Sequence, residues 1–180
     1  MRPHCYAPRV MPIDLASFEE RFADYIEHLG DLDVAALTAV LTTRDAAPGD
    51  LVIEQGSFHN ELLFLESGTL AVSVLNKSHE PHVVAELQPG AVVGEVGLLS
   101  PGPATASVIA QAPARYHALS SQALDGLWTT SPAAASSLIQ GLCHVMATRI
   151  RSVEGDLDKL DTQASGGLRG VLRRLFGRAA

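Results

Sequence analysis

Histidine and glutamate side chains come closest to a metal-site pattern in one short segment, His79-Glu80-Pro81-His82. Zinc enzymes with an HExxH motif place two histidines on one face of a helix, with the glutamate as general base. Here the spacing of the histidines is shorter, and Pro81 disfavours the helix that the motif requires. We therefore expect an exposed loop after Asn76-Lys77-Ser78 and no metal ion.

Nucleophilic chemistry has no stronger basis in the sequence. The chain lacks a Gly-x-Ser-x-Gly motif, a Walker loop and paired catalytic carboxylates, and nothing positions a base beside its serines and threonines. Cys5 and Cys143 are far apart and form no CxxC or zinc pattern, which indicates free thiols in a reducing compartment. The sequence thus predicts a protein without enzymatic activity.

The composition is that of a folded, acidic protein. The chain has 180 residues, of which 47% are hydrophobic and 18% charged, and its net charge is −7. This length suits one domain with extensions. Nucleic-acid-binding proteins usually carry a basic face, so the charge argues against such partners. No apolar run is long enough to span a membrane, and no signal peptide follows Arg2, so we expect a cytoplasmic location.

The hydrophobic pattern changes twice along the chain. Residues 1–13 read as an irregular arm, and residues 14–43 as two or three short helices. Residues 44–120 consist of short β-rich runs separated by turn residues, which is typical of an antiparallel roll or barrel. Strands are expected at 51–53, 62–65, 69–75, 83–87, 105–110 and 115–119.

Helical spacing returns over residues 121–161. A short helix is expected at 121–128, and Ser131-Pro132 resembles an N-cap followed by proline at the first helical position. A heptad seam follows on a long helix, formed by Ile139, Met146, Val153 and Leu160, with Cys143, Ile150 and Leu157 interleaved. Such a seam predicts a homodimer through helix 131–161, although packing on the chain's own roll is the alternative. Gly141 and Gly155 each weaken this helix by about 1 kcal/mol relative to alanine.

Residues 162–180 are expected to form a linker and a basic amphipathic tail. The segment 168–180 contains four arginines, no acidic residue and an apolar stripe at helical spacing. Such a helix could dock on the protein, bind a protein partner or contact a membrane surface. Its single short apolar face would give only modest membrane affinity.

One stretch, residues 89–108 (PGAVVGEVGLLSPGPATASV), resembles the phosphate-binding cassette of the cyclic nucleotide-binding domain family. Pro89-Gly90, Gly94-Glu95 and Pro103 fit the family pattern, whereas the family's phosphate-binding arginine falls on Ala104. The segments PGDLVIEQG (48–56) and LLFLESGTLAVSV (62–74) resemble the family's opening strand with its glycine turn and the next hairpin, with Gly68 as its turn.

The resemblance covers about Asp14 to Leu160, and we assign residues 14–161 to one domain of this kind. It implies an α+β fold: an antiparallel β-roll of the double-stranded β-helix or jelly-roll type. N-terminal helices would precede the roll, and a hinge helix and a long helix would follow it.

The resemblance also implies a binding site. In the family, a short helix offers backbone N–H groups to the cyclic phosphate, the arginine adds a charge-assisted contact, and the glutamate accepts a hydrogen bond from the ribose 2′-hydroxyl. Carried over by position, Glu95 would bind the ribose and Thr105 would donate to the phosphate. The candidate binding residues are Gly94, Glu95, Val96, Gly97, Ala104 and Thr105. Losing the arginine contact removes about 1.5–3 kcal/mol, or roughly 10- to 100-fold in affinity.

The sequence therefore predicts a non-enzymatic regulatory module that binds cAMP or cGMP weakly or not at all, and that senses another ligand or binds a protein. A first alternative is a true cAMP or cGMP receptor in which Arg115, Arg149 or Arg151 replaces the missing arginine. A second is a membrane-associated adaptor acting through residues 168–180. Transcription factors of the family carry a helix-turn-helix after the long helix; too few residues follow Leu160 for one, so no DNA partner is expected.

Overall fold

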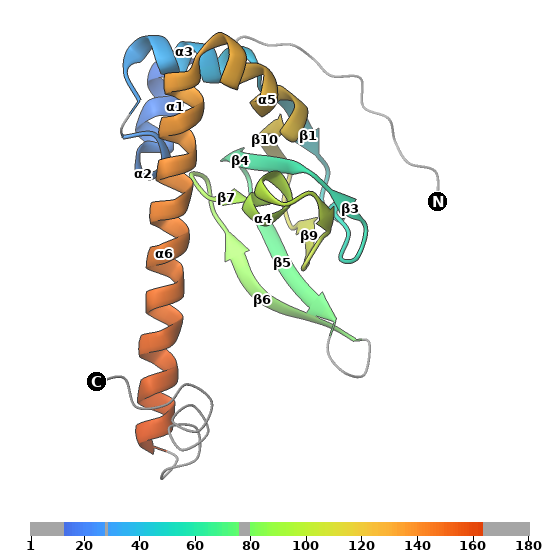
Figure 1. Ribbon diagram of the computed structural model, residues 1–180. Coiled ribbons are helices and arrows are strands. Elements are labelled where there is room, and N and C mark those ends of the chain that lie inside the picture. Colours follow the sequence, from blue (N-terminus) through green and yellow to red (C-terminus); the bar gives the residue numbers. More distant parts are fainter. Residues whose placement is uncertain (1–12, 28, 76–79, 164–180) are drawn as a thin grey trace, which may run out of the picture. The chain divides into compact units, whose positions relative to one another are not determined.

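The computed structural model describes residues 13–27, 29–75 and 80–163 (Figure 1). The chain divides into two compact units, residues 1–141 and residues 142–180. The predicted basic tail, 168–180, and nearly all of the predicted N-terminal arm lie outside the described residues. The first unit has the predicted α+β architecture, in which short helices precede an antiparallel β-roll and further helices follow it.

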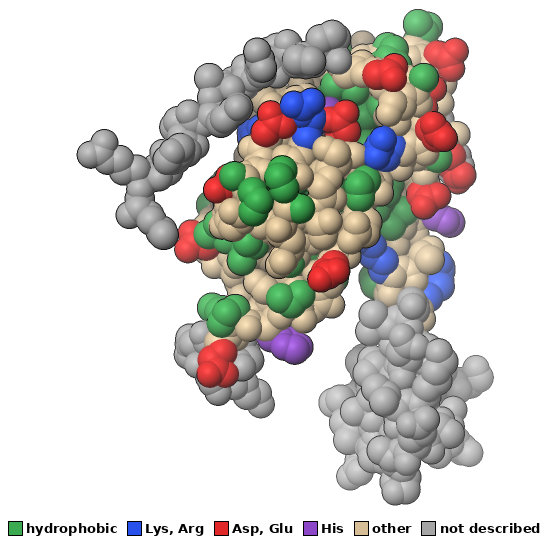
Figure 2. All heavy atoms as spheres, turned by 180° about the vertical axis from the view of Figure 1, so that it is seen from behind, with side chains coloured by type: hydrophobic (Ala, Val, Ile, Leu, Met, Phe, Trp, Pro, Cys, Tyr) green, Lys and Arg blue, Asp and Glu red, His purple; other side chains and the backbone are tan. Residues whose placement is uncertain are grey.

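The helical spacing after Asp14 produces α1 (Leu15–Arg21), α2 (Ala23–Ile26) and α3 (Asp31–Ala39). The helical region was predicted to continue to residue 43, but β1 begins at Thr42. Thr42 and Thr43 are β-branched, and they pair with Ala118 and His117 in a neighbouring strand. Strand pairing therefore prevails over the helical pattern here. Figure 2, viewed from behind, shows acidic side chains gathered over these N-terminal helices.

Two four-stranded antiparallel sheets form the roll, together with a two-stranded pair. The first sheet has the order β1 (Thr42–Ala46), β10 (Ala114–Ser120), β4 (Glu61–Ser67), β7 (Val92–Val93). The second has the order β2 (Leu51–Ile53), β9 (Ser107–Ala110), β5 (Leu70–Leu75), β6 (Pro81–Leu87). The pair consists of β3 (Phe58–His59) and β8 (Gly102–Pro103).

All of the predicted strands are present, but only β2 has the predicted bounds, and the other five differ by one or two residues at one or both ends. The run predicted at 105–110 begins at Ser107, which leaves Thr105 before the strand. The loop predicted at 79–82 is wrong at Pro81 and His82, which open β6; residue 79 lies outside the described residues. Proline is tolerated there because β6 is an edge strand and Pro81 is its first residue.

The sequence predicted a hairpin with Gly68 as its turn. This prediction is wrong, because β4 and β5 belong to different sheets. With φ of +86°, Gly68 is the corner at which the chain leaves one sheet for the other. A Cβ atom at this position would lie 2.6 Å from Ala114 Cα, so both the conformation and the close approach require glycine. This corner lets consecutive strands face each other across the roll.

The interior of the roll is apolar and contains many small side chains. Alternate residues of each strand point inward, so that Leu63 and Leu65 face the interior while Phe64 faces the N-terminal helices. The ring of Phe64 lies 5.4 Å from that of Phe18 and 5.2 Å from that of Phe22. The buried interior cluster consists of Ala46, Ile53, Leu63, Leu65, Leu70, Val108, Ala110, Ala114, Tyr116 and Ala118.

On the outer face of the same sheet, His117 is buried beneath the N-terminal helices. Its Nδ1 atom lies 3.0 Å from Thr43 Oγ1, its Nε2 atom lies 3.7 Å from Glu66 Oε2, and its ring lies 5.9 Å from that of Phe18. Burial lowers the pKa of His117 below its usual value; Glu66 opposes this shift, whereas Arg115 and Arg21 reinforce it. The folded protein therefore favours the neutral imidazole.

This burial predicts a pH-dependent stability. Because the unfolded chain takes up a proton on His117 near pH 6.5 and the folded chain does so only at lower pH, stability is full above about pH 6.5 and falls as the pH is lowered. Urea unfolding at several pH values between 7.5 and 5.5 measures how steeply the free energy of unfolding falls with pH. His117→Gln should make this dependence on pH weaker, since glutamine does not titrate. An equal dependence in the two proteins would contradict the assignment to His117.

Two helices follow the roll, as predicted. α5 (Ser121–Thr130) begins at Ser120, whose Oγ accepts a hydrogen bond of 3.1 Å from Ala123 N. α6 (Pro132–Gln163) begins at the predicted proline and extends three residues past Leu160. Ser131, the predicted N-cap, directly precedes α6, and its carbonyl accepts a hydrogen bond of 3.1 Å from the amide of Ala135. Its hydroxyl donates to Asp33 Oδ1 at 3.0 Å. Within the described ranges, none of the helices combines the length and apolar character needed to cross a bilayer.

Candidate functional site

The cassette, residues 89–108, contains the short helix that the family resemblance implies. β7 leads into Gly94, which has φ of +92° and ψ of 8° and precedes α4 (Glu95–Leu99). The amide of Leu98 donates to the carbonyl of Gly94 at 3.0 Å and so closes the helical turn. Because φ is positive at Gly94, a side chain there would be strained, which accounts for the glycine of the Gly94-Glu95 pair.

The ring of His59, on β3, fills the space beside this turn. A Cβ atom on Gly94 would lie 2.8 Å from His59 Nε2, and one on Gly97 would lie 2.6 Å from His59 Cδ2. Gly97 is therefore required by close packing rather than by a special backbone angle. His59 Nε2 is buried without a hydrogen-bond partner among the described residues, a costly arrangement that packing must hold in place.

His59 also connects the two halves of the cassette. It contacts the turn at Gly94 and Gly97 and, in β3, pairs with Gly102 of β8. Sequence reasoning missed this residue because a two-residue strand has no periodicity that could identify it. Only the pairing of β3 with β8 reveals that a distant histidine belongs to the cassette.

The remaining candidates differ in exposure. Glu95 is half-buried in the first turn of α4, Val96 exposes 47% of its surface, and Gly97 is buried. Thr105 is exposed and lies between β8 and β9. The structure thus brings Gly94 to Gly97 together as one turn. Ala104 and Thr105 follow this turn in the chain, directly after β8.

Ala104 joins the cassette to the roll. Its amide donates to the carbonyl of Ser57 at 2.8 Å, and its carbonyl accepts from the amide of Gly56 at 2.8 Å. Its methyl group is half-buried and packs against the apolar interior cluster. Ala104, to which the family resemblance assigns the phosphate-binding position, is therefore a small residue half-buried against apolar packing.

Comparison with known proteins identifies the domain. Residues 43–131 match the family model described as the cyclic nucleotide-binding domain. These residues belong to that family. A crystal structure of a cyclic nucleotide-binding domain from Methylobacillus flagellatus KT superimposes with a TM-score of 0.72 at 21% identity, covering 86% of this chain and 88% of that one.

Two further relatives are larger proteins. The acetyltransferase Pat of Mycolicibacterium smegmatis is 35% identical over 77 residues, which cover 43% of this chain and 23% of the acetyltransferase. The chain thus spans less than a quarter of that relative. The regulatory subunit of a cAMP-independent protein kinase A from Trypanosoma brucei has a TM-score of 0.61 at 18% identity, covering 73% of this chain and 46% of that subunit. A triple variant of the subunit, which includes a Thr→Arg change, was solved with cAMP in its A site.

Arg115, which the sequence analysis offered as a replacement phosphate contact, already contacts carboxylates on its own sheet. Its Nε and Nη2 atoms lie 2.7 and 3.3 Å from the carboxylate oxygens of Asp45, and its Nε lies 3.9 Å from Glu66 Oε2. These partners share the outer face of the sheet with His117, whereas Ala104 packs toward the interior. Arg149 and Arg151 lie on α6 in the second unit, and their role stays a prediction.

The sequence analysis did not single out Arg44, which lies on the same face of β1 as Ala46 but exposes 41% of its side chain. Its two terminal nitrogens lie 2.6 and 2.7 Å from the carboxylate oxygens of Glu61. The hydrogen bonds to Glu61 raise the pKa of Arg44, while burial raises the pKa of neighbouring Tyr116. Because Glu61 neutralises Arg44, the pair carries no net positive charge.

Proposed function

We propose that the chain is a non-enzymatic regulatory module of the cyclic nucleotide-binding domain family that does not respond to cAMP or cGMP and that regulates through contact with a protein. The observation that carries the proposal is the environment of Ala104. A cyclic phosphate is an anion, and burying it without a counter-charge is costly. The position that would supply the counter-charge is an apolar methyl group packed on an apolar core.

The arginines whose contacts are known also support the proposal that the chain does not respond to cAMP or cGMP. Arg115 is paired with Asp45, and Arg44 is held by both carboxylate oxygens of Glu61. If either arginine moved to a phosphate, its carboxylate would lose its cationic partner. The free energy lost in this way is similar to that gained from the new contact with the phosphate. The preserved turn at Gly94 supplies backbone donors, but without a cation these give only part of the family's binding energy.

Relatives provide a second line of support. A domain of this fold from T. brucei belongs to a kinase regulatory subunit described as cAMP-independent, and a variant of it with an added arginine was solved with cAMP. The fold therefore accommodates both cAMP-independent regulation and cAMP binding. The match to 23% of the length of an acetyltransferase also fits a module that occurs as one part of larger proteins.

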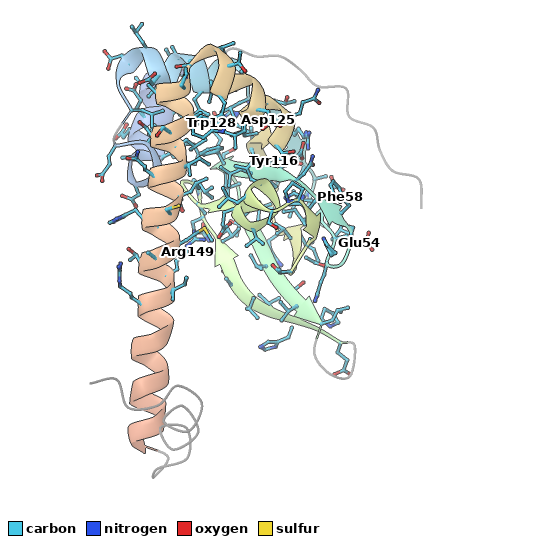
Figure 3. The ribbon with its side chains drawn as sticks, viewed as in Figure 1. Glu54, Phe58, Tyr116, Asp125, Trp128 and Arg149 are labelled. Atoms are coloured by element: carbon cyan, nitrogen blue, oxygen red, sulfur yellow. The ribbon has the colours of Figure 1, made fainter. Side chains whose placement is uncertain are left out.

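The surface around the cassette supports a protein partner. Phe58 exposes 71% of its surface, Val96 47% and Leu99 41%, and they lie on β3 and α4. Figure 3 shows Phe58 at the outer edge of the roll. Exposed apolar side chains suit a protein contact better than a phosphate ligand.

We also propose that the module is a homodimer through α6. Two residues of the predicted seam are exposed in the described part of this helix: Cys143, and Ile150, which exposes 58% of its surface. Pairing two such helices would bury these residues at the heptad interface. The dimer would place two regulatory modules in one assembly.

Isothermal titration calorimetry with cAMP and with cGMP tests the first proposal. We expect no binding in the micromolar range for either nucleotide, because the phosphate lacks a counter-charge. A dissociation constant in the low micromolar range for either one would overturn the proposal and favour a receptor with a relocated phosphate contact, for which Arg149→Met and Arg151→Met would then identify the residue.

A further inference from the structure

Two exposed apolar side chains lie where α3 meets the junction of α5 and α6. Leu32, in the first turn of α3, exposes 88% of its surface, and Trp128, in the last turn of α5, exposes 44%. Ser131, one turn after Trp128, donates its hydroxyl to Asp33, the residue next to Leu32. Leu32 and Trp128 therefore belong to one stretch of surface, which we call the junction surface.

The charges of the junction surface are negative. The charged residues of α3 and α5 are all acidic, namely Asp31, Asp33 and Asp125. Asp125 lies three residues before Trp128, and side chains at this spacing are neighbours on a helix (Figure 3). An exposed tryptophan beside carboxylates suits an arginine-rich partner, because a guanidinium group can stack on the indole ring and also pair with a carboxylate.

The chain itself contains a segment with the complementary chemistry. Residues 168–180 (LRGVLRRLFGRAA) include four arginines and no acidic residue, and their apolar residues recur at helical spacing. The apolar stripe of this segment matches Leu32 and Trp128, and its arginines match the surrounding carboxylates. Charge and apolar character thus single out this segment as the occupant of the junction surface.

The heptad seam of α6 indicates which copy supplies the segment. The seam runs from Ile139 to Leu160 and is centred on Ile150. When two such helices run antiparallel with their seams overlapped, the residues that follow Gln163 in one copy lie opposite the beginning of α6 in the other. The segment 168–180 of one copy then begins beside Ser131 of the other copy, where the junction surface lies.

We infer that the junction surface of one copy binds residues 168–180 of a second copy, in an antiparallel dimer through α6. The apolar stripe of the segment covers Leu32 and Trp128, and its arginines contact Asp31 and Asp125. This inference rests on the proposed homodimer, to which it adds a direction and a second contact. It is independent of whether the cassette binds a nucleotide.

Acrylamide quenching of Trp128 fluorescence in the full chain tests the docking, since Trp128 is the only tryptophan. Changing the four arginines of the segment to glutamine should raise the quenching constant about twofold, because Trp128 then regains its exposed surface. Changing the same residues to lysine retains the charge and should raise the quenching constant much less. The substituted residues are Arg169, Arg173, Arg174 and Arg178.

The acidic side of the contact gives an independent measurement. Asp31→Asn combined with Asp125→Asn should also increase the quenching of Trp128, because the arginines lose their partners. Glu54→Gln combined with Glu86→Gln is the matched control, since it removes two charges from exposed residues elsewhere on the roll. This control should leave the quenching unchanged.

Sedimentation equilibrium and oxidation of Cys143 test the dimer and its direction. In a parallel dimer the two Cys143 residues lie opposite each other, whereas full antiparallel overlap separates them by about 21 Å, too far for a disulfide. We expect the full chain carrying Cys5→Ser to be a dimer and to form no disulfide with oxidised glutathione.

The outcomes separate the inference from the homodimer on which it rests. A monomer in sedimentation would contradict the homodimer and the inference together. A disulfide-linked dimer would show a parallel arrangement, and so retain the homodimer and overturn the inference. A dimer whose Trp128 is quenched equally in the unmodified chain and in the glutamine variant would likewise overturn only the docking.

Discussion

Replacing Ala104 with arginine is expected to raise the affinity of the chain for cAMP by about 10- to 100-fold. The substitution supplies a counter-charge at the position where the family resemblance predicts the phosphate-binding arginine. The glycine conformation at Gly94 and the donors of α4 are already in place. In the absence of nucleotide, the arginine should lower the unfolding midpoint, because its charge meets the apolar cluster on which Ala104 packs.

Calorimetry measures the gain in affinity, and thermal unfolding with and without cAMP measures the accompanying stabilisation. Ala104→Met is the matched control, since it adds a long side chain without a charge. We expect Ala104→Met to bind cAMP no better than the unmodified chain. Equal affinity of the arginine and methionine variants would show that charge at residue 104 does not limit binding.

Gly141→Ala is expected to destabilise the protein by about 1–3 kcal/mol, although alanine is the better helix former. A Cβ atom on Gly141 would meet the carbonyl oxygen of Tyr25 and lie 2.8 Å from its carbonyl carbon. Both contacts are to backbone, so the first part of α6 would have to move away from α2. The loss of packing then exceeds the gain in helix propensity.

Gly126→Ala in α5 should stabilise the protein, in contrast to Gly141→Ala. Nothing lies within 4 Å of a Cβ atom there, so only propensity acts, and a gain of up to about 1 kcal/mol is expected. Urea unfolding of both variants gives the comparison. A stabilising effect of Gly141→Ala would mean that α6 does not approach Tyr25 as closely as the structure indicates.

Strands that are long enough to show a hydrophobic pattern could be predicted from the sequence. Strands that form only because a neighbouring strand pairs with them could not. The run at 51–53 coincides with β2, and the edges of the other predicted runs differ by a few residues. β3, β7 and β8 have two residues each, too few to display a period. They form because the roll places a partner beside them.

The same distinction applies to the candidate site. The turn at Gly94-Glu95 follows from a local motif and could be predicted. The assignment of the family's arginine position to Ala104 rests on the same motif and stays a prediction. The engagement of Arg115 with Asp45 depends on the register between β1 and β10, and the contact of His59 with Gly97 depends on the pairing of β3 with β8. Sequence reasoning had no access to register, so it offered Arg115 as a replacement and overlooked His59.

The exposed edge strand β6 bears on how copies of the chain avoid aggregating. Val83 and Val84 expose 52% and 53% of their surfaces on a seven-residue strand at the edge of its sheet, which could in principle pair with the same strand of another copy. Pro81 lacks an amide donor, and the register shift opposite Val72 and Ser73 bends the strand. The proline and the register shift therefore both disfavour extension of this sheet through β6.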